Sequence, residues 1–89
     1  MQFKVISERQ IGYRRDKVSV HWIDDSGLHW ISHVYIADEL EEDTLATLEK
    51  GFVERLAIDI RNSEVEPTTR ELRQLIEEVV EAFDRSNMF

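Results

Sequence analysis

The 89-residue chain contains no cysteine, only one proline and only three glycines. The lack of cysteine excludes disulfide cross-links, thiolate zinc sites and cysteine nucleophiles, and it is typical of a reducing compartment. No apolar run approaches the roughly 18–20 residues of a membrane-spanning helix, and no basic-then-apolar leader opens the chain. We therefore expect a cytoplasmic protein that does not bind membranes.

Positive charge is also scarce, with 11 Lys and Arg residues against 19 Asp and Glu residues, a net charge of −8. Residues 1–37 carry five basic and four acidic side chains, a net +1, whereas residues 38–89 carry six and fifteen, a net −9. A surface of this sign repels nucleic acid and phospholipid, and it favours either plain solubility or a basic protein partner. The sequence therefore indicates a protein partner, itself basic or nucleic-acid-binding, rather than direct contact with nucleic acid.

Hydrophobic residues make up 42% of the chain and charged residues 34%, which is typical of a globular protein, and the length fits one domain over residues 1–89. Alternation of apolar and polar residues predicts strands at about 2–8, 17–24 and 28–36. In these strands β-branched and aromatic residues are frequent.

The segment Asp24-Asp25-Ser26-Gly27 predicts the turn between the last two strands. A three-residue loop over residues 25–27, with Gly27 in the left-handed conformation, would place Trp22 opposite Trp30. Because opposite residues share one side of a sheet, this register collects both tryptophans on one face, and a longer loop would scatter them. We therefore expect the shorter loop.

Helical periodicity predicts two helices, at about 39–61 and 69–85. Asp38 with Glu41, and Thr68 with Glu71, each match a capping box at the start of a helix. The fold class that follows is α+β, a three-stranded antiparallel sheet with two helices packed on one face. In the second helix, the residues expected to face the sheet are Leu72, Ile76, Val79 and Phe83.

The first helix has a less regular pattern than the second. Glu49 and Asp59 fall inside its apolar arc, and Ile58 falls nearly opposite that arc. Gly51 lies in the middle of the helix. Either the helix kinks at Gly51, or it contacts something beyond its own domain.

The side of the hairpin opposite the tryptophans has an unusual composition, and the residues on it that we predict to bind a partner are His29, Ile31, His33 and Tyr35. A solvent-facing strand surface usually carries Lys, Glu, Thr and Ser. Together with His21 the histidines suggest zinc, but residues four apart on a strand lie about 13 Å apart, too far for ligands of one ion. The alternatives are a partner-binding surface or an ordinary outer face with scattered apolar residues.

Four acidic residues of the second helix form a further predicted partner-binding group: Glu77, Glu78, Glu81 and Asp84. An ordered row of carboxylates can occupy a basic groove that normally holds nucleic acid. The alternative is that these side chains only solvate the helix.

One basic segment, which contains Arg9, Tyr13, Arg14 and Arg15, offers a weak anion-binding site. Its affinity would depend strongly on salt, because the rest of the chain is acidic. The alternative is a solvated loop that pairs with the chain's own acids.

No catalytic motif, metal-ligand spacing or cofactor-binding signature is present in the sequence, so we expect neither an enzyme nor a cofactor. The favoured hypothesis is a small acidic protein-interaction module, of the kind that phages and mobile elements encode, which binds and inhibits or modulates a protein complex. The alternatives are a structural subunit that forms homo-oligomers, such as a homodimer, and a weak nucleic-acid binder that uses the Arg9–Lys17 loop.

Overall fold

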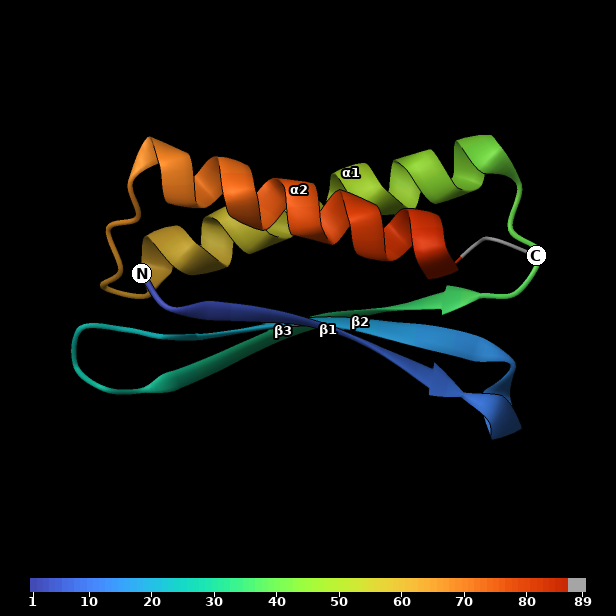
Figure 1. The fold of residues 1–89 in the computed structure, drawn as a ribbon, viewed down its shortest axis with the longest axis horizontal. Helices are drawn as coiled ribbons and strands as arrows, with labels where there is room; N and C mark the ends of the chain where they lie inside the picture. Colours follow the sequence, from blue (N-terminus) through green and yellow to red (C-terminus); the bar gives the residue numbers. More distant parts are fainter. Residues whose placement is uncertain (87–89) are drawn as a thin grey trace.

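The structure, a computed structural model, describes residues 1–86. In chain order it contains strands β1 (Phe3–Gln10), β2 (Arg15–Ile23) and β3 (His29–Ala37), followed by helices α1 (Glu42–Asn62) and α2 (Thr69–Ser86). A one-turn 3₁₀ helix, Ile11–Tyr13, joins β1 to β2. Both helices lie antiparallel to each other on the same side of the sheet, so the expected α+β arrangement is confirmed (Figure 1).

The sheet is antiparallel with strand order β1-β2-β3, and its register agrees with the one deduced from the turn. Trp22 lies opposite Trp30, and the two indole rings stack with centroids 6.1 Å apart. On the other side of β2, Phe3 completes the same row. The register thus collects Phe3 and both tryptophans on the face that the helices cover.

The β2–β3 turn is the predicted three-residue loop. The amide of Asp24 donates to the carbonyl of Leu28 at 2.9 Å, which closes the loop over residues 25–27. Gly27 has a φ of 88°, the left-handed conformation that favours glycine. Leu28, at which the third strand was expected to begin, lies instead outside β3 and is exposed.

The first two strands are longer than the sequence suggested. Arg9 pairs with Asp16 and Gln10 pairs with Arg15, so only residues 11–14 separate the strands. Arg14 adopts a left-handed φ of 53° and its amide donates to the carbonyl of Ile11 at 3.2 Å, which closes this short connection. The predicted bounds, with β1 ending at about residue 8 and β2 beginning at about residue 17, therefore left out the paired end of this hairpin.

One of the two predicted capping boxes is present. At the start of α2, the amide of Glu71 donates to Thr68 Oγ1 at 3.2 Å and the amide of Thr68 donates to Glu71 Oε1 at 3.1 Å. At α1 the prediction was wrong, because the helix begins at Glu42 and the side chain of Asp38 binds Arg9 instead.

The core lies between the sheet and the two helices and is formed by these buried apolar residues: Val18, Val20, Trp22, Ile36, Phe52, Leu56, Ile60, Val65, Leu75, Val79, Ala82 and Phe83. The indole nitrogen of Trp22 donates to Ser63 Oγ at 3.1 Å, so the one polar atom of this buried ring is paired. The expectation that Ile76 is buried was wrong. The buried apolar residues of α2 are Leu75, Val79, Ala82 and Phe83, and Ile76 lies to one side of this group and is 41% exposed.

The irregular residues of α1 have separate explanations, and the helix continues through Gly51 without interruption. Asp59 accepts a hydrogen bond from the buried Ser32 of β3 at 2.9 Å and one from Arg55 at 3.2 Å. Glu49 lies near Asp84 of α2, and Ile58 is exposed. Asp59 thus fits the sheet-facing side of α1 because a polar serine of β3 meets it there.

Candidate interaction surface

The sheet face turned away from both helices, here the outer sheet face, is built by alternate residues of the three strands (Figure 1). No helix in the described part of the chain covers it. Its residues are Lys4, Ile6, Glu8, Gln10, Arg15, Lys17, Ser19, His21, Ile23, His29, Ile31, His33, Tyr35 and Ala37. All four sheet residues that the sequence pointed to as partner-binding therefore share one uncovered surface.

Large apolar side chains on this face are open to solvent. Ile31 is 59% exposed, and Ile23 and Tyr35 are each 39% exposed. Ile23 lies opposite His29 and Ile31 lies opposite His21, so the two isoleucines occupy neighbouring rows. Clustered apolar groups of this kind are typical of contact surfaces, whereas single ones are not informative.

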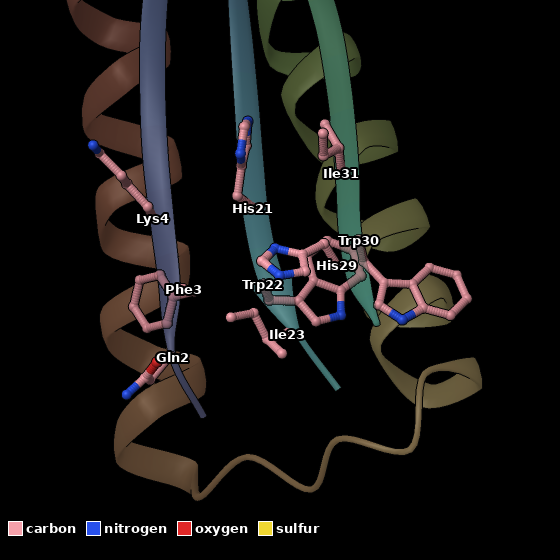
Figure 2. A pocket seen from close by; sticks show the side chains of 9 residues that line it. All are labelled: Gln2, Phe3, Lys4, His21, Trp22, Ile23, His29, Trp30 and Ile31. Carbon is pink, nitrogen blue, oxygen red and sulfur yellow. The ribbon is translucent and has the colours of Figure 1, made fainter. Parts of the chain in front are cut away.

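A hollow of about 280 Å³ lies at the β2–β3 turn end of the sheet. Figure 2 shows Lys4, His21 and Ile31 side by side on the three strands that line it, with the helices behind the sheet. The hollow is smaller than most small-molecule sites but has the size to accept a side chain of a partner.

A second hollow, of about 370 Å³, lies between β3 and α1. Its lining includes Ile31 and His33 from β3 and Arg55 and Asp59 from α1. Ile31 lines both hollows and therefore lies between them, with 59% of its surface exposed.

At the other end of the outer sheet face, Arg15 stacks between two tyrosines. Its Cζ lies 4.5 Å from the ring centroid of Tyr13 and 3.8 Å from that of Tyr35. Its Nε donates to Gln10 Oε1 at 2.7 Å. Lys17 Nζ lies 6.0 Å from the centroid of the Tyr35 ring, and the His33 and Tyr35 rings pack in a T-shaped arrangement with their centroids 5.2 Å apart. The result is a compact group of cationic and planar side chains.

The predicted anion-binding group is divided between the two faces of the sheet. Tyr13 and Arg15 come together as described, and Arg14 lies in the turn beside them. Arg9 is on the opposite face, where its guanidinium donates to both carboxylate oxygens of Asp38 at 2.5 and 2.7 Å. These hydrogen bonds hold the pKa of Asp38 below its ordinary value. Arg9 therefore does not contribute to an anion site with Arg15.

The acidic residues predicted on the second helix do lie on its solvent side, with Glu77, Glu81 and Asp84 exposed and Glu78 half-buried. None of the four is at ion-pair distance from a cation within residues 1–86. Arg73 and Arg85 are each one turn away from one of these acids. The acidic row is therefore flanked by a positively charged residue at each end.

The three histidines of the outer sheet face lie in different rows, opposite Ile31, Ile23 and Ser19. Among residues 1–86, no three histidine or carboxylate side chains converge closely enough to hold a metal ion.

The two layers of the molecule differ in charge. The outer sheet face carries Lys4, Arg15 and Lys17 against the single acid Glu8, a net +2, although the whole chain has a net charge of −8. The sequence alone assigned Arg15 to a loop. Its place on the sheet follows from its pairing with Gln10 of β1 and Ala37 of β3, which no local signal reveals.

Comparisons of the chain with protein-family models, with curated proteins and with solved structures give no match. No helix in residues 1–86 is long and apolar enough to cross a bilayer.

Proposed function

We propose that this chain is a protein-interaction module whose contact surface is the outer sheet face. The observation that carries the proposal is Ile31, which is 59% exposed between two hollows and has His29 and His33 on either side of it along β3. Burying an exposed isoleucine in a partner contributes about 1.5–3 kcal/mol. Tyr35 and Arg15 add the residue types that dominate binding energy at protein interfaces.

The acidic side of α2 is the less favoured surface for the partner. Glu77 and Glu81 lie within one turn of Arg73 and Arg85, which is the mixed pattern of a solvated helix. The apolar group on α2 beside the exposed acids, Ile76, is also less open to solvent than Ile31, at 41% against 59% exposed. Contact through the outer sheet face would inhibit or modulate a complex by occupying the surface that another subunit needs, the role expected of a phage-encoded accessory protein.

The proposal is tested with the full chain immobilised as bait for a lysate of its source organism. We expect Ile31→Glu to lose the proteins that the wild type captures, because it places a charge at the apolar anchor. Glu81→Gln, an exposed change on α2, is the matched control and should retain them. Thermal unfolding verifies that both variants are folded, which the exposure of both positions leads us to expect.

Capture that survives Ile31→Glu but is lost in Glu81→Gln would move the contact surface to the helices and contradict the proposal. Sedimentation of the purified protein tests the homo-oligomer alternative. If the wild type dimerises at high micromolar concentration and Ile31→Glu does not, the outer sheet face joins two copies of the chain. The protein would then be a structural subunit and not a module that binds another protein.

A further inference from the structure

The guanidinium of Arg15 is held in place before any ligand binds. The rings of Tyr13 and Tyr35 flank it at 4.5 and 3.8 Å, and Gln10 accepts its Nε–H. No carboxylate of residues 1–86 is at ion-pair distance from it. The two terminal nitrogens of Arg15 are the donors left for a ligand, and this pair of N–H groups matches the two oxygens of a carboxylate.

The surroundings of Arg15 favour a negative ligand. Lys17 lies between Tyr35 of β3 and Glu8 of β1 in the register, and Lys4 lies further along the same face, so the face has a net charge of +2 with Glu8 included. The acids on the solvent side of α1 and α2 are separated from it by the sheet and a helix about 10 Å across. This distance exceeds the screening length of about 8 Å at physiological salt, so the acidic layer repels a ligand on the outer sheet face only weakly.

The apolar end of the same face indicates that the ligand is a protein. Tyr35, which Arg15 covers, lies four residues from Ile31 on β3, a distance of about 13 Å along the strand. Ile23 and Ile31 gain free energy when a protein side chain covers them, whereas a phosphodiester backbone offers them nothing.

From these features we infer that the outer sheet face docks an acidic protein segment, in which a carboxylate binds Arg15 and an apolar side chain about 13 Å away packs against Ile31. This inference rests on the proposed function and adds the charge of the partner's contact surface. It is opposite in sign to the basic partner that the net charge of the chain suggested.

The test is a titration of the isotope-labelled full chain with a synthetic peptide that carries two aspartates at one end and a leucine four residues away, followed by amide NMR. We expect shifts confined to the outer sheet face. Arg15→Ala should weaken binding at least about tenfold, because it removes a charge-assisted pair of hydrogen bonds. Arg15→Lys should restore only part of the affinity, since an ammonium cannot replace the planar fork, and Glu81→Gln should bind as the wild type does.

Parallel titrations use the same peptide with lysines in place of the aspartates, and an oligothymidylate. Tighter binding of either ligand than of the acidic peptide would overturn the inference, the second in favour of a nucleic-acid platform. Equal binding by the wild type and Arg15→Ala would also overturn it. Shifts that appear on concentrating the protein alone would assign the face to a second copy. If lysate capture depends on Ile31 but not on Arg15, the proposed interaction function still holds, and only the inference that the partner's contact surface is acidic is wrong.

Discussion

Asp24 is the residue that organises the β2–β3 turn. Its Oδ1 accepts hydrogen bonds from the Ser26 amide at 3.0 Å, the Ser26 hydroxyl at 2.6 Å and the Leu28 amide at 2.9 Å. Its Oδ2 accepts one from the indole nitrogen of Trp30 at 2.9 Å. The Ser26 hydroxyl, then Trp30, lower the pKa of Asp24 to about 2. One carboxylate thereby links the loop to the tryptophan stack.

A prediction about pH follows from this lowered pKa. The ionised form of Asp24 is favoured in the folded protein, so its contribution to stability is complete above the ordinary value of 3.8 and is lost as the pH falls through about 2. We expect Asp24→Asn to unfold at a lower temperature than the wild type at pH 7. We also expect the variant to lose less stability than the wild type between pH 4 and pH 2.

Thermal unfolding over this pH range measures both effects. The control is Asp25→Asn, which removes the same charge from an exposed neighbour. If Asp24→Asn and Asp25→Asn gave the same profile, general charge rather than the four hydrogen bonds would explain the result.

Single residues also show where the sequence was informative. Asp38 with Glu41 and Thr68 with Glu71 have the same spacing, yet only the second pair caps a helix. The difference is a contact across 29 positions, since Arg9 binds Asp38. Local patterns therefore predicted the turn, the register and one cap, but could not reveal which side chains a distant strand would bind.

At the level of whole elements, α1 and the β2–β3 turn use glycine in opposite ways. Gly51 lies in an uninterrupted helix, and a Cβ added there would have no neighbour within 4 Å. Gly27 has equal space around it but a φ of 88°, where a side chain is strained. Available space is the same, so backbone conformation alone separates the two positions.

The same substitution should therefore have opposite effects at these positions. We expect Gly51→Ala to raise the free energy of unfolding by about 0.5–1 kcal/mol, because alanine loses less conformational entropy in a helix. We expect Gly27→Ala to lower it by about 1–2 kcal/mol, the cost of a left-handed alanine. Urea unfolding of the two variants beside the wild type measures both changes. A loss of stability in Gly51→Ala would show that the helix needs glycine there, as the kink considered from the sequence would require.

The site divides in a similar way between what the sequence can and cannot show. Alternation along β3 was enough to place His29, Ile31, His33 and Tyr35 on one face, because the period of a strand is fixed. The stack of Arg15 with Tyr13 and Tyr35 was not foreseen. It unites three segments, and its formation depends on the β1–β2 and β2–β3 registers together.

Over the whole molecule, negative charge is concentrated in the helical layer. Burial raises the pKa of Glu49 on α1, and the neighbouring Asp84 carboxylate on α2 raises it further, so the two helices bring like charges together. On α2 itself, Glu81 is within one turn of three acids, Glu77, Glu78 and Asp84, but of only one cation, Arg85. Such repulsion lowers the stability of the compact state.

We therefore expect Glu81→Lys to raise the free energy of unfolding by about 0.5–1 kcal/mol at low salt, since it converts three repulsive pairs into attractive ones and makes only the pair with Arg85 repulsive. The gain should shrink as sodium chloride is added, because salt screens exposed charges. Lys4→Glu changes the net charge by the same amount in the other direction on the outer sheet face, and should alter stability little because no acidic cluster surrounds it. Urea unfolding at several salt concentrations compares the three proteins.

If Lys4→Glu lost as much stability as Glu81→Lys gained, the total charge of the chain would determine stability, and not the concentration of negative charge in the helical layer. A gain that salt left unchanged would instead show that the effect of Glu81→Lys is not electrostatic.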